Sequence, residues 1–137
     1  MISTNEQDVN SKQKDKKVIK CVVWDLDNTL WQGVLLEDEK VSLRNNIVNI
    51  IHTLDNRGIL QSIASKNEST TAIAKLEELG LKENFLNPQI NWNSKANSLK
   101  EISKLLNIGL DAIAFVDDQL FELEEVKFSL PEILCLN

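Results

Sequence analysis

The sequence predicts an α/β fold in which helices cover both faces of a central parallel sheet, giving a three-layer sandwich. Short apolar runs rich in β-branched residues alternate along the chain with segments of helical pattern. Strands that alternate with helices pair in parallel, because each crossover helix returns the chain to the same end of the sheet. A length of 137 residues, with 42% hydrophobic and 26% charged residues, suits one globular domain.

Each element of this fold has its own signal in the sequence. Strands are predicted where β-branched and other apolar residues cluster, over residues 18–24, 59–64, 112–116 and 131–136. Helices are predicted over residues 47–57, 68–79 and 120–128, with a further helix that begins at Lys95 and ends near Gly109. Gly58 and Gly80 follow the first two of these helices, as expected at helix ends.

Two segments are expected to differ from this alternation. Residues 31–43 carry Gly33 and a charged tip between two apolar pieces, which indicates a small hairpin or flap. Residues 85–92 contain Pro88 and are expected to form a loop with room for one short strand. The flap is the only cap that we expect over a site at the sheet edge.

The first 17 residues differ in composition from the rest of the chain. They hold four lysines and few large apolar side chains, and the composition changes sharply at Val18. We therefore expect a disordered N-terminal arm over residues 1–17 and a single folded domain over residues 18–137.

Composition and charge argue against several classes of function. A net charge of −6 argues against nucleic acid or an anionic membrane as the main partner. The chain has no apolar run of about 18 residues and no apolar core of a secretory signal, so we expect a cytoplasmic protein. Cys21 and Cys135 are too few for a disulfide framework, and a single histidine argues against a structural zinc site.

Four carboxylates follow two of the predicted strands, at the sheet edge where ligands bind in parallel α/β folds. Asp25 and Asp27 follow the first strand, and Asp117 and Asp118 follow the strand at 112–116. Carboxylates that meet in one crevice repel each other, and Mg²⁺ relieves the repulsion because it prefers oxygen ligands. Aspartate is also a common turn residue, but its occurrence at two strand ends favours a metal site.

A hydroxyl and an ammonium group are expected beside these carboxylates. Ser65 follows the strand at 59–64, and Lys95 begins a helix further along the chain. This set suits a phosphoryl group, because the metal and the lysine neutralise its oxygens while the hydroxyl donates a hydrogen bond. One carboxylate can then attack phosphorus to give an aspartyl-phosphate, and a second can protonate the leaving oxygen and activate water.

These motifs and their order resemble those of the haloacid dehalogenase (HAD) superfamily. The series is DxDNT at residues 25–29, a strand-end Ser65, Lys95, and a hydrophobic strand that ends in Asp117 and Asp118. The resemblance extends from Lys20 to the end of the sequence and implies a HAD-like, Rossmannoid domain with a minimal cap. The segments VVWDLDNTLWQGV, IASKNE, INWNSKANSLKEISKLLNIGLDAIAFVDD and FELEEVK further resemble FkbH-like proteins, of the subfamily IIIC phosphatase type.

The resemblance implies a role for each carboxylate. Asp25 matches the nucleophile and Asp27 the general acid and base. Asp25 also matches a Mg²⁺ ligand through its carboxylate, and Asp27 one through its backbone carbonyl. Asp118 matches the direct metal ligand of the last motif, and Asp117 its partner in the same motif.

The resemblance also implies the phosphate-binding residues. Ser65 and Lys95 match the groups that hold the phosphoryl group. Asn28 completes the first loop as a further phosphate-binding residue, while Thr29 is expected to brace the backbone there. Lys66 and Asn67 either reach the substrate or cap the helix that follows.

The FkbH-like subfamily loads glyceryl units from 1,3-bisphosphoglycerate onto acyl carrier proteins in polyketide pathways. The resemblance thus implies a phosphorylated small molecule as substrate, an acyl carrier protein as partner and glyceryl transfer as the activity. Two positions depart from the subfamily pattern at the expected pocket rim. Gln32 stands where the subfamily has glycine, and Gln119 and Leu120 stand where it has Asn-Pro.

Three alternatives compete with glyceryl transfer. The first is a small stand-alone HAD phosphatase that acts on another phosphate ester or on a phosphoprotein. The second is an inactive HAD scaffold that binds a partner. A phosphoryl-receiver domain is rejected by motif order, because its acidic pair follows the first strand and its lysine comes near the last.

A few other side chains carry more modest predictions. Trp31 either lines the pocket or anchors the flap. The acidic run of Glu122, Glu124 and Glu125 is expected to be a solvated helix face. Cys21 and Cys135 are expected to be small apolar side chains rather than nucleophiles.

Overall fold

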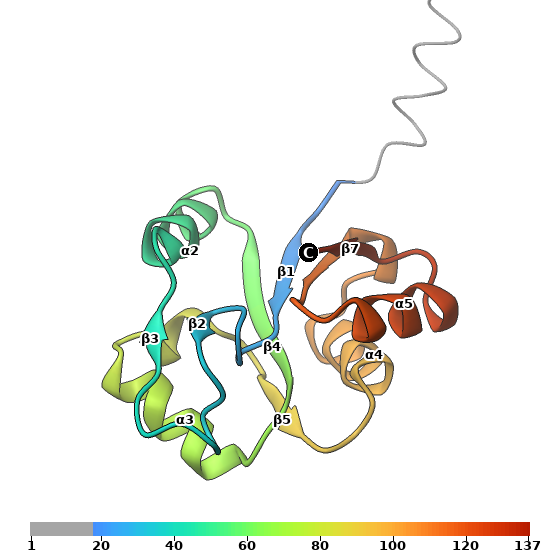
Figure 1. Ribbon diagram of the computed structural model, residues 1–137. Helices are drawn as coiled ribbons and strands as arrows, with labels where there is room; N and C mark the ends of the chain where they lie inside the picture. Colours follow the sequence, from blue (N-terminus) through green and yellow to red (C-terminus); the bar gives the residue numbers. More distant parts are fainter. Residues whose placement is uncertain (1–17) are drawn as a thin grey trace, which may run out of the picture.

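A computed structural model describes residues 18–137 of the chain (Figure 1). The main sheet has five parallel strands in the order β5-β4-β1-β6-β7. These strands are β1 (Cys21–Trp24), β4 (Leu60–Lys66), β5 (Gln89–Asn91), β6 (Ile113–Val116) and β7 (Leu134–Leu136). The predicted α/β fold with a central parallel sheet is confirmed. The predicted disorder of residues 1–17 lies outside the described residues.

Helices cover both faces of the sheet, as the strand–helix alternation predicts (Figure 1). On one face lie α2 (Ile47–Asn56) and α3 (Ser69–Glu78), and on the other lie α4 (Lys95–Leu106) and α5 (Leu120–Ser129). Two short 3-10 turns, η1 (Lys82–Asn84) and η2 (Leu110–Ala112), join these elements. In the described chain, no helix combines the length and the apolar character that a membrane span needs.

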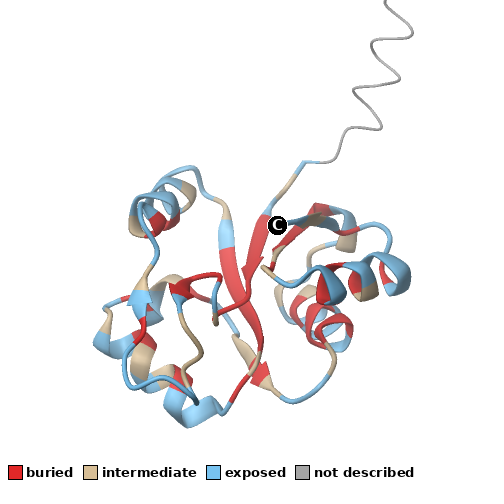
Figure 2. Ribbon diagram, in the orientation of Figure 1, coloured by how far each residue is buried: buried red, intermediate tan, exposed pale blue. Residues whose placement is uncertain are grey.

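The side chains of β1 divide the core into two clusters. Val22 and Trp24 pack with α2 and α3, whereas Cys21 and Val23 pack with α4 and α5. All four residues of β1 are buried, as expected for a central strand that is covered on both faces. Figure 2 shows the buried residues concentrated along the central strands and on the helix faces turned toward them. Because successive side chains alternate, Asp25 continues the face of Val23, toward α4 and α5.

The predicted flap is a two-stranded antiparallel hairpin of β2 (Trp31–Gln32) and β3 (Ser42–Leu43). Trp31 is fully buried and so fixes the base of the hairpin to the core. Gly33 has a φ of +102°, and a Cβ there would lie 2.8 Å from the Asp38 carboxylate. Glycine is therefore needed at this turn.

Strand boundaries differ from the predicted ones at several ends. β4 extends two residues beyond Ala64, because Ser65 and Lys66 pair with the edge strand β5. β5 itself occupies residues 89–91, inside the predicted loop. The last strand starts at Leu134 because the chain first turns, with the Ile133 N–H donating to the Leu130 carbonyl. The first two differences follow from the pairing of β4 with β5, which is distant in sequence, and the third follows from a local turn.

Candidate active site

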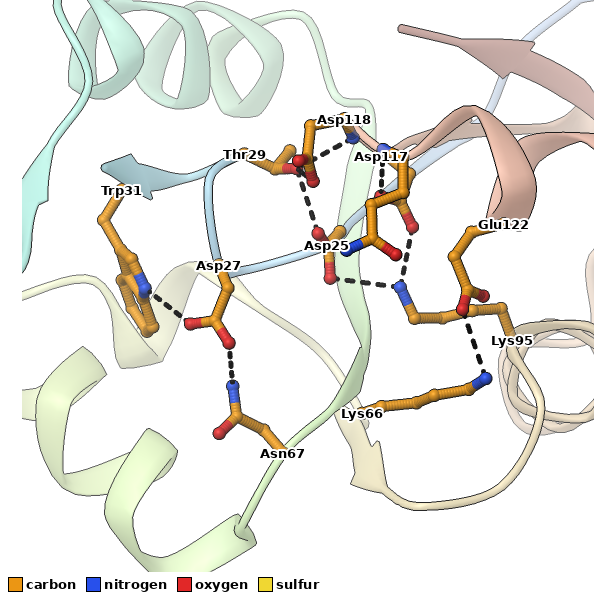
Figure 3. A network of polar contacts seen from close by, with 11 residues as sticks. Asp25, Asp27, Thr29, Trp31, Lys66, Asn67, Lys95, Asp117, Asp118 and Glu122 are labelled. Atoms are coloured by element: carbon orange, nitrogen blue, oxygen red, sulfur yellow. Dashed lines mark hydrogen bonds and ion pairs between the residues drawn. The ribbon is translucent and has the colours of Figure 1, made fainter. Parts of the chain in front are cut away.

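The carboxyl ends of β1 and β6 bring three carboxylates together (Figure 3). One carboxylate oxygen from each of Asp25, Asp117 and Asp118 lies within 4.8 Å of the others. Asp25 directly follows β1, and the other two directly follow β6, which is its neighbour in the sheet. Asp25 and Asp117 are buried and Asp118 is half-buried. This cluster lies at the sheet edge where the sequence predicts ligand binding.

Lys95, the first residue of α4, points its ammonium group into this cluster. The Lys95 Nζ lies 3.1 Å from Asp25 Oδ1 and 2.7 Å from Asp117 Oδ2. It also lies 5.4 Å from the centre of the Phe115 ring. Burial alone lowers the pKa of Lys95, but the charges of Asp25 and Asp117 outweigh it, so the pKa lies above its ordinary value. Lys95 is therefore a cation at neutral pH.

The surroundings of Asp25 strongly perturb its carboxyl group. Burial raises the pKa of Asp25 from 3.8 to about 7, while the Lys95 charge opposes this rise and the Asp117 charge adds to it. The Lys95 charge thus offsets the effect of burial only in part, and a further cation beside Asp25 would favour its ionised form.

The donor set fits a divalent metal ion. When all three carboxylates are ionised, they exceed the one ammonium group by two negative charges. Mg²⁺ is a hard cation that prefers carboxylate, carbonyl and water oxygens, so its ligand preference and its charge both match this cluster. Mg²⁺ is therefore the cofactor that the site fits, with Asp25, Asp117 and Asp118 as the available carboxylates.

The Thr29 hydroxyl joins the two ends of the cluster. Its Oγ1 lies 3.0 Å from Asp25 Oδ2 and 3.1 Å from Asp118 Oδ1, and it accepts a hydrogen bond from the Asp118 N–H. The single hydroxyl proton can be donated to only one of the two carboxylates at a time. Thr29 therefore fixes the β1 loop against the β6 loop, in keeping with the bracing role expected for it.

The Asp27 carboxylate is held by a different set of partners (Figure 3). Its Oδ1 accepts hydrogen bonds from the Trp31 Nε1 and the Leu35 N–H, both at 3.0 Å. Its Oδ2 accepts one from the Asn67 Nδ2 at 3.1 Å. Of the four carboxylates expected in one crevice, the cluster thus contains three, and Asp27 faces the flap. Trp31 anchors the flap through both its buried ring and this hydrogen bond.

The other two predicted phosphate-binding residues are Ser65, on the strand next to β1, and Asn28, in the loop that follows Asp25. Ser65 is buried on β4, two residues beyond Ile63, the register partner of Trp24. Asn28 adopts a left-handed backbone conformation with a φ of 57°. The Asn28 Oδ1 accepts a hydrogen bond from the Gly33 N–H at 2.9 Å, which ties the β1 loop to the flap. The phosphate-binding role of Asn28 therefore stays a prediction.

One contact at the sheet edge was missed by sequence reasoning. The Lys66 Nζ lies 3.1 Å from Glu122 Oε1, in an ion pair between the end of β4 and the first turn of α5. Glu122 is 6% exposed, so the prediction of a solvated face is wrong for Glu122, although Glu124 is exposed. A carboxylate four residues after Asp118, on the helix that begins beside the cluster, was the available signal.

Neither cysteine belongs to the carboxylate cluster. Cys21 is fully buried at the start of β1, and burial raises its pKa to about 12. Cys135 lies on β7, which pairs with β6 at the edge of the sheet. The Cys21 thiol therefore does not form a reactive thiolate at neutral pH.

Comparison with known proteins identifies the class of this fold. No protein-family model and no curated protein sequence matches the chain. Among solved structures, it is similar to a Bacteroides fragilis protein whose N-terminal part contains a phosphatase domain, solved in complex with Mg. The TM-score is 0.80 at 30% identity, and the match covers 89% of this chain and 36% of that one.

Two further structures are more distant in sequence. A 3-deoxy-D-manno-octulosonate 8-phosphate phosphatase from Moraxella catarrhalis, in complex with magnesium, phosphate and KDO, matches with a TM-score of 0.62 at 23% identity. That match covers 80% of this chain and 63% of that one. A HAD-superfamily hydrolase from Ehrlichia chaffeensis matches with a TM-score of 0.68 at 12% identity, covering 89% of this chain and 93% of that one.

These similarities define the class of the fold. The chain has a HAD-like α/β fold, which it shares with the HAD-superfamily hydrolase, the Moraxella phosphatase and the phosphatase domain of the Bacteroides protein. It spans 36% of the length of the Bacteroides protein and 63% of the length of the Moraxella phosphatase. The fold is thus shared with these neighbours, and two of them were solved with magnesium.

Proposed function

We propose that this protein is a Mg²⁺-dependent phosphohydrolase that acts through an aspartyl-phosphate on Asp25. The observation that carries the proposal is the buried Asp25 carboxylate, which is in contact with Lys95 and has Asp117 and Asp118 within ligand distance. An anionic nucleophile needs cationic surroundings to approach a phosphoryl group, which is itself anionic. Lys95 provides one positive charge and a bound metal ion provides the rest.

In the first half of the reaction, one Asp25 carboxylate oxygen attacks phosphorus. The bond between phosphorus and the leaving oxygen breaks, and Asp27 donates a proton to that oxygen. Trp31 and Asn67 hold the Asp27 carboxylate by hydrogen bonds on both of its oxygens, so its direction is fixed. The product of this half-reaction is a phosphorylated Asp25 and a free alcohol.

In the second half, water attacks the phosphorus of the aspartyl-phosphate. Asp27 takes a proton from this water, the bond between phosphorus and the Asp25 oxygen breaks, and inorganic phosphate leaves. Both side chains return to their starting protonation states. The same acid–base group therefore serves both halves of the cycle.

The remaining assignments concern binding. The Asp25 and Asp118 carboxylates and the Asp27 backbone carbonyl would hold Mg²⁺, with Asp117 supporting the metal site and Lys95. Bound there, the metal neutralises phosphoryl oxygens and keeps Asp25 ionised.

Ser65, Lys95 and Asn28 would hold the phosphoryl group itself. Lys95 lies in the cluster and Ser65 is on the strand next to β1, so both are near the place where Asp25 meets phosphorus. Asn28 could contribute only its side-chain N–H₂, because its Oδ1 is bonded to Gly33.

Trapping the covalent intermediate tests this function. The protein is incubated with Mg²⁺ and an activated phosphate ester such as p-nitrophenyl phosphate, and the reaction is quenched in acid. After digestion, the mass of the peptide that contains residue 25 is measured by mass spectrometry. We expect a phosphorylated peptide at Asp25 and phosphate release that falls at least about 10⁴-fold in Asp25→Asn. Phosphate release that survives in Asp25→Asn would reject the covalent route.

Glyceryl transfer to an acyl carrier protein is the second candidate function. In that reaction the carrier thiol attacks the acyl carbon of 1,3-bisphosphoglycerate, the bond from that carbon to the phosphate oxygen breaks, and phosphate leaves. The two-strand flap leaves the site open, and the exposed Trp92, Leu120 and Phe121 beside β5 and α5 offer apolar surface to a large partner. Because Cys21 is buried, the thiol would have to belong to the carrier.

Mass spectrometry separates these candidates from an inactive scaffold. A holo acyl carrier protein is incubated with this protein, Mg²⁺ and 1,3-bisphosphoglycerate, and released phosphate is measured in the same tubes. A glyceryl adduct that is absent with Asp25→Asn would establish loading. Phosphate release without an adduct would leave the phosphohydrolase, and the absence of both would favour a scaffold that binds a partner without turnover.

A further inference from the structure

A second feature beside the site is a buried carboxylate oxygen that has no hydrogen-bond partner. Over residues 18–137, Glu122 Oε2 is the one buried side-chain oxygen or nitrogen that has no hydrogen-bond partner. The other oxygen, Oε1, pairs with the Lys66 ammonium at 3.1 Å. The side chain of Glu122 is only 8% exposed, so half of a buried carboxylate stays unsatisfied.

Stability of the fold does not account for this arrangement. Burial removes the hydration of the Glu122 carboxylate, and the ion pair with the partly exposed Lys66 compensates for this at only one of its two oxygens. An apolar pair of similar size would join β4 to α5 at a lower cost. The carboxylate of Glu122 therefore points to a role in holding Lys66 where it is.

The position of Lys66 suggests what that role is. Lys66 continues the face of Ala64 on β4, and Asp25 continues the face of Val23 on the adjacent β1, so both face α4 and α5. In the register of these strands, Lys66 lies two residues beyond the position level with Asp25, which is about 7 Å further toward the mouth of the site. Figure 3 shows Lys66 and Glu122 on the opposite side of Asp25 from Asp27 and the flap.

A substrate must extend outward from Asp25 between these two sides, because Asp27 has to reach the leaving oxygen while Lys66 lies at the other side of the mouth. The leaving group lies across phosphorus from the attacking oxygen, because attack and departure are in line. If Asp25 attacks, the leaving group points outward from the sheet edge, into the region that Lys66 reaches. The Lys66 side chain is 35% exposed, so its ammonium can contact a ligand while it remains bonded to Glu122.

We propose that Lys66 binds the leaving group of the phosphate ester and that Glu122 is a positioning residue that holds the Lys66 ammonium for this contact. The inference rests on the proposed function, since it takes Asp25 as the attacking group. The pair is neutral overall and presents N–H donors, so it favours a leaving group rich in hydroxyl oxygens over an apolar one or a second anion. Polyol and sugar phosphates belong to this class.

A matched pair of esters tests the selectivity. Glycerol 3-phosphate and propyl phosphate have the same carbon number and differ in two hydroxyl groups. We expect the wild-type protein with Mg²⁺ to prefer glycerol 3-phosphate by at least about tenfold in kcat/KM. Lys66→Met should reduce this preference to within about twofold, mainly by raising KM for glycerol 3-phosphate.

Three further variants separate positioning from simple stability. Lys66→Arg should keep most of the preference, because it retains N–H donors. Glu122→Gln should lower the preference by about threefold while kcat on propyl phosphate stays constant. Lys75→Met, which removes a lysine paired with Glu78 on α3, is the control and should leave both esters unchanged. Equal losses on both esters in Lys66→Met and Glu122→Gln would show a merely structural pair and overturn the proposal.

Binding distinguishes failure of this proposal from failure of the proposed function. Calorimetry with Asp25→Asn measures affinity for the two esters without turnover. If neither ester is hydrolysed by the wild-type protein but glycerol 3-phosphate binds more tightly and Lys66→Met removes the difference, leaving-group recognition stands and phosphohydrolase activity on these esters does not. Equal binding of the two esters, or binding of neither, would reject Lys66 as the selective contact.

Discussion

Asp25 and Asp27 are two residues apart on one loop, yet their carboxylates lie in opposite surroundings. Asp25 is buried among charges, with Lys95 and Asp117 as its neighbours. Asp27 is held on the flap side by neutral N–H donors from the backbone and from Trp31 and Asn67. The difference comes from the elements that each meets: α4 and β6 on one side, the hairpin and the end of β4 on the other.

This difference shows how one short loop can supply two kinds of chemistry. The ionisation of a buried carboxylate depends on the cations beside it, so a bound metal ion would favour its charged form. A carboxylate held by neutral donors on both oxygens is fixed in direction without a nearby counter-charge. The proposed nucleophile and the proposed acid–base group therefore differ in environment rather than in residue type.

Among the variants that test this difference between Asp25 and Asp27, Asp27→Asn is expected to have the largest effect. Asp27→Asn removes the proposed proton carrier but keeps an oxygen that can accept from Trp31, so the flap should stay in place. We expect kcat on an ester with a poor leaving group to fall by about 10³-fold, with a melting temperature close to wild type. Steady-state kinetics and thermal denaturation check this.

The choice of leaving group provides the control for that variant. With p-nitrophenolate, which leaves without protonation, the first half-reaction should suffer far less, and phosphorylated Asp25 should accumulate. An equal loss on both esters, without accumulation, would contradict the acid–base role of Asp27.

Lys95→Met is expected to have the next largest effect, on stability. Removing the ammonium group leaves the Asp25 and Asp117 carboxylates buried without their shared partner. We expect a loss of about 3 kcal/mol in the free energy of unfolding, measured by urea denaturation without metal. Lys75→Met removes a lysine whose partner, Glu78, is exposed, and it should change little. A Lys95→Met protein as stable as wild type would show that the carboxylates simply take up protons.

A third prediction concerns pH and Mg²⁺. Because the pKa of Asp25 is raised to about 7 in the folded protein, the native state binds a proton that the unfolded state releases above its ordinary pKa of 3.8. This contribution to stability is full at low pH and is lost as pH rises toward 7. Mg²⁺ must displace that proton, so its stabilising effect should grow from about pH 5 to about pH 8.

Melting temperatures with and without Mg²⁺ across this range measure the effect. Lys95 does not contribute to the change, because its pKa lies above the ordinary value and it stays charged throughout. Asp25→Asn should remove most of the pH dependence of the Mg²⁺ shift. A Mg²⁺ shift of the same size at both ends of the range would argue against Asp25 as a ligand.

The smallest effect is expected at Trp31. Trp31→Phe keeps an aromatic ring in the core and removes only the N–H that bonds to Asp27. We expect a loss of about 1 kcal/mol in stability and a several-fold decrease in kcat, because Leu35 and Asn67 still hold the carboxylate. Denaturation and kinetics on the same ester check both values. An unchanged kcat would show that the Trp31 hydrogen bond serves the flap alone.

The sequence by itself determined the fold class and the end of the sheet at which chemistry can occur. Buried strands such as Cys21–Trp24 are short and β-branched, and carboxylates directly follow both β1 and β6. These are local properties of the chain, set by residue type and spacing. Because parallel strands end at the same edge of the sheet, Asp25 and Asp118 are both expected at that edge, whereas the pairing of β1 with β6 belongs to the tertiary structure.

Only the tertiary structure decided which side chains meet. Asp27 turns to Trp31 and Asn67 rather than to the other carboxylates, and Glu122 is buried against Lys66 rather than solvated. These contacts join segments up to 56 residues apart, and spacing along one segment carries no information about them. Burial and hydrogen bonding across elements fix them, because each buried polar group takes the partner that packing brings within reach.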